Sequence, residues 1–212
     1  MFNDEQVRAI NYLSSLLPLV RKHEFMIIKH MFEDVNSEHE IEKLLCEEIS
    51  GCSVEHVQHA LRFMTEGGVI VRKEGELFFN CEIDVELKEY INDLMEYGLK
   101  QYSASYKNDK DDFLLWHDYR QDQALLKILE NPKHNQYGSY YKNGNIYIFA
   151  GLKKNDTVQE HLNYKDKFLD NDVFQWESVA HISKREKERQ DQSEKAFIFV
   201  RKVESENGIT LP

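Results

Sequence analysis

The sequence has few of the residues that stabilise small secreted proteins, and it has no long apolar segment. Only three of its 212 residues are cysteine and three are proline. An odd cysteine count without paired ligand spacing indicates neither a disulfide framework nor a zinc motif. No run approaches the roughly 18 apolar residues of a membrane helix, and the start, MFNDEQVRAI, lacks the basic residues of a signal peptide. We therefore expect a cytoplasmic protein without membrane contacts.

Basic residues are scarce in the first half of the chain. The sequence has 27 basic and 38 acidic residues, a net charge of −11. Nine basic and 20 acidic residues lie at or before Gly98, and the remainder, 18 of each sign, lies after it. Nucleic-acid affinity comes largely from neutralised phosphates, so the acidic half disfavours nonspecific binding, although a local basic patch could still bind. The change in charge also predicts two structural units.

Motifs for catalysis and for metal binding are missing as well. No G-x-x-x-x-G-K-[ST] phosphate loop occurs, which excludes nucleoside triphosphate hydrolysis by that route. His23 and His30, or His56 and His59 beside Glu55, could contribute metal ligands, but no third ligand is fixed and a solvated helix face is the commoner interpretation. We expect no cofactor, no metal and no enzymatic activity. Other possible acid, base or nuclease groups, whose spacing specifies no site, are His117, Asp118, Asp122, Asp166, Asp170 and Asp172.

Periodic apolar residues predict a helical N-terminal half that ends in a hairpin. The expected helices cover residues 4–20, with Pro18 as a kink or end, 23–32, 37–49 and 53–66, and the expected strands cover 69–71 and 77–79. This order is that of a winged helix. Its reading surface would carry Arg62, Arg72 and Lys73 with Glu55, Gln58 and His59. Since so few of these residues are basic, we favour a protein-interaction or structural role for this half over DNA binding.

A polar run, YSASYKNDKDD, follows the next expected helix, 84–107, and predicts the boundary between two domains, 1–107 and 113–212. Beyond it we expect a short strand or apolar plug at 113–116, a helix at 122–129 and a hairpin that turns at Asn143-Gly144. The predicted fold class is α+β, with a winged-helix-like N-terminal half and a mixed, mostly β C-terminal domain.

Residues 164–178, YKDKFLDNDVFQWES, interleave large aromatic side chains with charged ones and are followed by the apolar strand that starts at Ala196. Strand alternation puts Phe174, Trp176 and Ser178 on one face. We expect Phe174 in the core and Trp176 at a pocket wall. The charged segment 183–194 is typical of a solvated helix or mobile loop, with a basic contact surface as the alternative.

Four segments resemble, in order and spacing, the domain of unknown function at the C-terminus of bacterial DEAD/DEAH-type helicases, which often also carry a phospholipase D-like nuclease. They are FLLWHDYRQDQALLKIL, YGSYYKNGNIYIFAGLKK, YKDKFLDNDVFQWES and FIFVRK. The resemblance covers residues 113–202, and the preceding helical part is similar to the segment that precedes this domain in those proteins. It implies a fragment or stand-alone relative without the motor and nuclease domains. Two features depart from the family pattern, namely Arg120-Gln121-Asp122, where a second basic residue is common, and the final segment 207–212.

The resemblance implies a context of nucleic-acid processing and supplies no reaction. Our first hypothesis is a non-catalytic accessory module that binds nucleic acid, DNA rather than RNA, through its β domain. The expected contacts are Arg120, Tyr137, Tyr141, Lys153, Lys154, Trp176, Ser178, Arg201 and Lys202. Cations would bind phosphate, and aromatic rings would stack on bases. The alternative is a protein-interaction or regulatory module that docks on helicase or nuclease domains, in cis or in trans, or on another partner.

Overall fold

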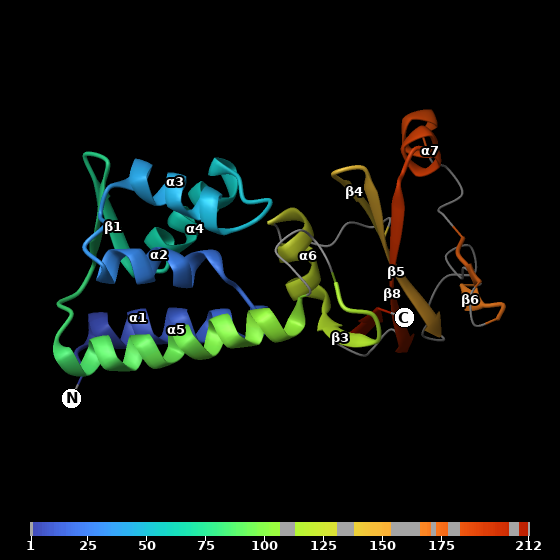
Figure 1. Ribbon diagram of the computed structural model, residues 1–212. Helices are drawn as coiled ribbons and strands as arrows, with labels where there is room; N and C mark the ends of the chain where they lie inside the picture. Colours follow the sequence, from blue (N-terminus) through green and yellow to red (C-terminus); the bar gives the residue numbers. More distant parts are fainter. Residues whose placement is uncertain are drawn as a thin grey trace. The chain divides into compact units, whose positions relative to one another are not determined.

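A computed structural model of the chain has helices concentrated in its N-terminal part and its larger sheet in the C-terminal part, which is an α+β arrangement (Figure 1). It divides into two compact units, residues 1–113 and 114–212. The structure describes residues 2–106, 113–130, 138–153, 166–170, 173–177, 183–203 and 208–211. None of the helices in these ranges is both long and apolar enough to cross a membrane.

The N-terminal unit contains five α-helices, a 3₁₀ turn and one hairpin in its described part. They are α1 (Asp4–Leu16), η1 (Leu17–Leu19), α2 (His23–Phe32), α3 (Glu38–Glu48), α4 (Val54–Glu66), β1 (Ile70–Lys73), β2 (Glu76–Phe79) and α5 (Val85–Ser105). The side chains of the residues that precede four of these helices, Asn3, Ser37, Ser53 and Asp84, accept backbone N–H groups of the first turn. The helices expected to begin at Ser37 and Ser53 are therefore present. Pro18 ends α1 and lies within η1.

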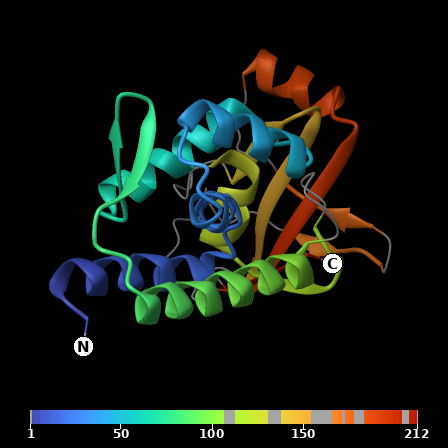
Figure 2. The same ribbon diagram turned by 60° about the vertical axis from the view of Figure 1, so that its left-hand side comes forward.

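A predominantly aliphatic core holds this unit together. It includes Leu13, Ile28, Leu45, Leu61 and Ile91, one from each α-helix. Pairs of helices that pack together include α1 with α5, α2 with α4 and α3 with α4, and the long α5 runs beside α1 in both views (Figures 1 and 2). The sequence of helices and hairpin agrees with the predicted order, while membership of the winged-helix class stays a prediction.

The C-terminal unit is organised around a five-stranded sheet. Its described elements are β3 (His117–Arg120), α6 (Gln121–Leu129), β4 (Ser139–Lys142), β5 (Asn145–Lys153), β6 (Lys167–Phe168), β7 (Phe174–Gln175), α7 (Lys184–Asp191), β8 (Lys195–Val203) and β9 (Gly208–Leu211). The strand order of the large sheet is β3-β9-β8-β5-β4, and β6 pairs with β7 in a separate ladder. The predicted hairpin is present, because β4 pairs with β5 across Asn143-Gly144, where both residues have positive φ.

The central pair, β5 and β8, is parallel and is reinforced by stacked rings. Tyr147 stacks on its register partner Phe197 with 5.0 Å between ring centroids, and Phe149 stacks on Phe199 with 4.8 Å. Such pairs stabilise a sheet beyond their apolar burial.

Residues 113–116, expected to form a short strand or an apolar plug, do not form a strand, and of their apolar side chains Phe113 is buried whereas Leu115 and Trp116 are exposed. Phe113 forms an isolated bridge with Tyr106, and Trp116 has a φ of 61°, in the left-handed region, so the strand starts at His117.

Candidate binding surfaces

The predicted reading surface of the N-terminal unit is engaged in an internal hydrogen-bond network. Arg72, at the hairpin, donates from Nε to Oε2 of Glu38 at 3.0 Å and from a terminal nitrogen to Oε1 of Gln58 at 2.9 Å. Gln58 in turn donates to Glu38 at 2.7 Å and to Glu42 at 2.6 Å. The guanidinium of Arg72 is therefore held by protein acceptors, which reduces its availability for phosphate.

This network also perturbs a carboxyl group. Burial opposes ionisation of Glu38, but the hydrogen bonds from Arg72 and Gln58 outweigh that effect and lower the pKa of Glu38 below its ordinary value. Arg62, the cation expected on the reading helix, is exposed and lies over the ring of Phe63, 5.1 Å from its centroid. Fewer cations of this surface are therefore available to bind a polyanion than the sequence suggests.

In the C-terminal unit, Tyr141 and Trp176 pack against the same apolar cluster. The cluster is formed by Ile146, Ile148 and Ala150, which alternate along one face of β5. Phe174 packs there too, so the predicted alternation of Phe174 and Trp176 places both rings against one sheet face, and both remain partly exposed. Of the predicted site residues whose side chains are described, these two aromatic ones, Tyr141 and Trp176, lie on a common cluster.

Helix α7 supplies a cation to this region. The guanidinium carbon of Arg189 lies 5.9 Å from the centroid of the Tyr141 ring, within cation–π range. Burial raises the pKa of Tyr141. The helix itself carries no buried residue, which agrees with the predicted solvated helix, and its start is fixed by reciprocal hydrogen bonds between Ser183 and Glu186.

The predicted phosphate contact Arg120 is paired within the protein. Its terminal nitrogen lies 2.7 Å from Oδ2 of Asp122 and its Nε 3.1 Å from Oδ1, a bidentate arrangement. This pairing raises the pKa of Arg120 and lowers the pKa of Asp122. Asp122, also considered above as a catalytic carboxylate, therefore serves as a partner for a neighbouring cation.

The remaining predicted site residues are dispersed or undescribed. Arg201 occupies an odd-numbered position of β8, like Phe199, whereas the cluster that contacts Trp176 includes Ile198; strand alternation thus assigns Arg201 to the opposite face. Lys153 and Lys202 are described as strand positions only. Outside the described residues lie Tyr137, Lys154 and Ser178.

Two of the other carboxylates have local structural contacts. Asp166 is buried and accepts the backbone N–H of Glu177 at 3.0 Å, and Asp170 accepts that of Val173 at 2.8 Å. The first contact joins the residues that flank the open end of the β6–β7 ladder, and the second is a local side-chain-to-backbone contact, a common role for aspartate. Asp172 lies outside the described residues, and His117 and Asp118 are consecutive residues of β3.

One surface was not foreseen from the sequence, the outer face of α5. Tyr90 and Tyr97, which are 44% and 54% exposed, are seven residues apart and so lie on one side of the helix. Exposed carboxylates at Glu86, Glu89, Asp93 and Glu96 lie beside them on the helix. Tyr90 also meets the ring of Phe2 edge to face, and the hydroxyl of Tyr97 accepts a hydrogen bond from Gln101 at 3.0 Å. The sequence contained a signal for this surface, because two tyrosines seven residues apart occur among acidic residues. The apolar residues on the opposite face of the helix were used to predict the helix, and the tyrosine face was not considered.

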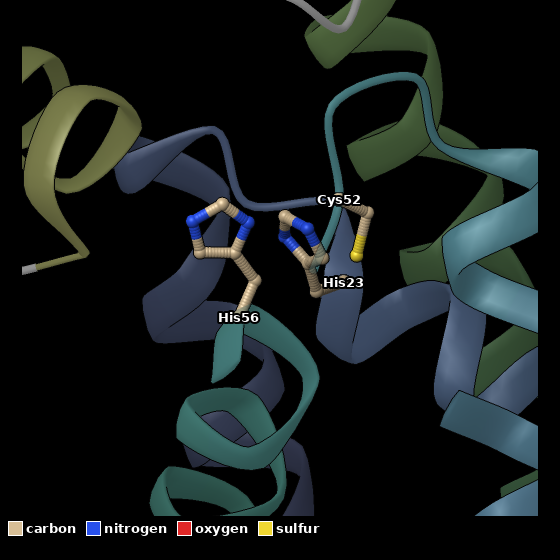
Figure 3. Close-up of side chains that lie close together, drawn as sticks. All are labelled: His23, Cys52 and His56. Carbon is tan, nitrogen blue, oxygen red and sulfur yellow. The ribbon is translucent and has the colours of Figure 1, made fainter. Parts of the chain in front are cut away.

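A second unforeseen group joins His23, Cys52 and His56. His23 is the first residue of α2, Cys52 lies between α3 and α4, and His56 is in the first turn of α4. All three are half-buried, and one nitrogen or sulfur ligand atom from each lies within 4.8 Å of the other two (Figure 3). Sequence spacing pairs His56 with His59, whereas the fold pairs it with residues from other segments.

Residues 113–210 match a family model described as a domain of unknown function, DUF3427. The matched range contains all the described strands of the five-stranded sheet except the last residue of β9. No curated protein and no solved structure is significantly similar to the chain.

Proposed function

We propose that this chain is a non-catalytic accessory module of a helicase or nuclease system, and that its N-terminal unit docks on a basic surface of a protein partner. The observation that carries the proposal is the outer face of α5, where two exposed tyrosines lie beside four exposed carboxylates and one exposed lysine, Lys100. Tyrosine is enriched at protein interfaces because its ring gives a large contact area and its hydroxyl can hydrogen-bond. The carboxylates give this face the charge complementary to a basic surface.

The pairing of one expected DNA-reading cation, Arg72, and the acidic charge of this unit support the same proposal. Arg72 is held by Glu38 and Gln58, and the first 98 residues carry a net charge of −11, from 9 basic and 20 acidic residues. A surface of this sign repels phosphate and attracts lysine and arginine side chains. The helicase context rests on the resemblance of the C-terminal segments to a helicase-associated domain; the DUF3427 match covers the same segments and assigns them no function.

The test measures binding to the separately purified motor domains of a DEAD/DEAH-type helicase from the same organism, by titration calorimetry at low and high salt. We expect the triple variant Glu89→Gln, Asp93→Asn, Glu96→Gln to bind about tenfold more weakly, since it removes charge complementarity at the interface. Added salt should weaken the wild-type complex more than the variant complex.

A matched control removes the same amount of charge elsewhere on the unit. Glu47, Glu55 and Glu74 are exposed residues on α3, on α4 and in the hairpin turn. Their triple replacement by glutamine should leave affinity within about twofold of the wild type, because charges distant from an interface couple weakly at physiological salt. Equal losses in the two triple variants would show a general charge effect and would contradict docking through α5. Unchanged binding by both triple variants would also contradict docking through α5.

A second candidate function, nucleic-acid binding by the C-terminal unit, is favoured by Arg189 over the ring of Tyr141 and by the shared cluster of Tyr141 and Trp176. Aromatic rings beside a cation are suited to single strands, where stacking contributes about 1–3 kcal/mol per base. Fluorescence anisotropy with labelled single- and double-stranded oligonucleotides at low salt tests this.

Arg189→Gln should weaken the binding of single strands severalfold, whereas Arg185→Gln, an exposed cation on the same helix, serves as the control. Absence of binding by the wild-type protein to either oligonucleotide would reject this second function. It would leave the docking proposal intact.

A further inference from the structure

We propose that His23, Cys52 and His56 form a binding site for a transition metal, with Zn²⁺ as the best chemical match. Among residues whose side chains the structure describes, they are the one group of three histidine, cysteine or acidic residues close enough to share an ion. Two imidazoles and a thiolate make a nitrogen- and sulfur-donating set, which selects zinc and its neighbours over magnesium or calcium.

The fold brings these ligands together by packing the N-terminal ends of two helices. Helix α2 packs on both α3 and α4, so its first residue, His23, approaches the loop that leads into α4. In that loop, the backbone N–H of Cys52 donates to Ile49 at 3.0 Å, and Gly51 has a φ of 80°. The rings of His23 and His56 meet edge to face, with 5.9 Å between their centroids, and Figure 3 shows the sulfur of Cys52 next to His23.

The hydrogen bonding of His56 prepares one of its nitrogens for a metal. The backbone N–H of Ser53 donates to Nδ1 of His56 at 3.3 Å, so Nδ1 carries a lone pair in this geometry. Metal ligation requires that same lone pair. An ion bound at Nδ1 would displace one long hydrogen bond and would require no change of tautomer.

Cys52 must lose its proton to bind. Its thiol lies 3.6 Å from the carbonyl oxygen of Ser53, a weak contact that metal binding would replace. Conversion of the thiol to a thiolate releases one proton to solvent for each ion bound. Ligand atoms around tetrahedral zinc are about 3.3–3.6 Å apart, so atoms now within 4.8 Å need small side-chain rotations. Three protein ligands leave a fourth position for water or for a group outside this set.

The test uses the full chain, reduced with a phosphine and titrated with Zn²⁺ and with Co²⁺. We expect one ion per chain, a micromolar or tighter dissociation constant for Zn²⁺, proton release in calorimetry, and sulfur-to-cobalt charge-transfer absorption. Cys52→Ser should abolish that absorption and weaken Zn²⁺ binding at least about 100-fold, since even the loss of a supporting contact around a ligand can weaken binding 10- to 100-fold.

The variant His56→Gln separates a ligand from a capping residue. Glutamine at this position of a helix keeps the reciprocal cap with Ser53 but removes the imidazole, so the fold should be retained while Zn²⁺ binding is lost. Cys46→Ser and His59→Gln, outside the group, are the controls and should bind as the wild type does. No Zn²⁺ binding by the folded wild-type protein, or binding that Cys52→Ser leaves unchanged, would overturn the proposal.

Discussion

The two units of this chain are stabilised by different kinds of side chain. The core of the N-terminal unit is mainly leucine, isoleucine, valine and methionine, whereas the sheet of the C-terminal unit is held by aromatic pairs across β5 and β8. Within each helix of the first unit, backbone hydrogen bonds join residues four positions apart. The parallel pairing of β5 with β8, in contrast, joins residues about fifty positions apart, as in Tyr147 with Phe197. Sequence patterns that depend on residues close together in the chain therefore predict the structure of the first unit better than that of the second.

The units also use their cations differently. In the N-terminal unit, Arg21 and Arg72 are both held by carboxylates, and the first of these is buried. In the C-terminal unit, Arg120 is paired, whereas the exposed Arg189 lies over the ring of the half-buried Tyr141. A cation that stabilises its own fold is a weaker candidate for phosphate binding than one that is exposed beside an aromatic ring.

The largest effect that we expect is cleavage of the chain into its two units by limited digestion with trypsin. Lys107 and Lys110 lie in the polar sequence run that precedes the division at residue 113, and segments of small and polar residues at domain boundaries are preferred sites of cleavage. Digestion should give two stable fragments that divide at these lysines. Both tryptophans, Trp116 and Trp176, follow that position, so the C-terminal fragment alone should absorb and fluoresce as a tryptophan protein. A single protected core, or early cleavage inside either unit, would contradict this division.

Next in size is the replacement Glu24→Ala in the N-terminal unit. The Nε–H of Arg21 donates to both carboxylate oxygens of Glu24, at 3.0 and 3.1 Å, and the side chains of Glu24 and Arg21 are 1% and 6% exposed. The variant leaves a buried cation without its carboxylate, which should cost about 3–5 kcal/mol of unfolding free energy. Urea denaturation followed by circular dichroism measures the loss.

Tryptophan fluorescence should report an unchanged C-terminal unit in the same Glu24→Ala sample, because no tryptophan lies before residue 116. The control Glu47→Ala removes an exposed carboxylate and should change stability by no more than about 0.5 kcal/mol. A parallel loss of both signals would mean that the units unfold together.

The replacement Trp176→Ala tests how much the packing of this side chain stabilises the C-terminal unit. Trp176 is half-buried against Ile146, Ile148 and Ala150, so we expect a loss of about 2 kcal/mol, below the 3–5 kcal/mol typical of a fully buried tryptophan. Trp116→Ala removes the same side chain where it is 74% exposed and should have little effect. Thermal unfolding of both variants, with oligonucleotide binding alongside, distinguishes core packing from ligand contact. A Trp176→Ala protein that melts and binds as the wild type would exclude both roles.

The smallest effect concerns the Arg72 network and its pH dependence. Arg72→Met should lower stability by about 1 kcal/mol at neutral pH, as expected for a partly exposed ion pair. Because Arg72 lowers the pKa of Glu38 in the folded state, this stabilisation is present above the ordinary value of 4.5 and is lost as the pH falls through the folded pKa. The wild type and variant should therefore converge in acid. Lys73→Met is the control, and a difference between Arg72→Met and wild type that persists unchanged at low pH would disprove the linkage.

The sequence by itself determined the elements whose hydrogen bonds are local. The helix starts at Ser37 and Ser53 and the turn at Asn143-Gly144 could be predicted, since a cap or a tight turn depends on residues three or four positions apart. The acidic character of the first half could also be predicted, since it follows from a count of charged residues. Strand β9 was not predicted, and neither was the late start of β3, because both depend on pairing between segments distant in the chain.

Tertiary structure alone decided which side chains share a surface. Trp176 and Tyr141 share one apolar cluster because Tyr141 on the neighbouring strand β4 and the residue that follows β7 both pack against Ile146, Ile148 and Ala150 of β5. Arg201 lies on the opposite face because of its register in β8. The ligand atoms of His23 and Cys52 lie within 4.8 Å of each other because α2 packs on α3 and α4. Local propensity contains no information on such contacts, since they form only when apolar faces far apart in sequence are buried together.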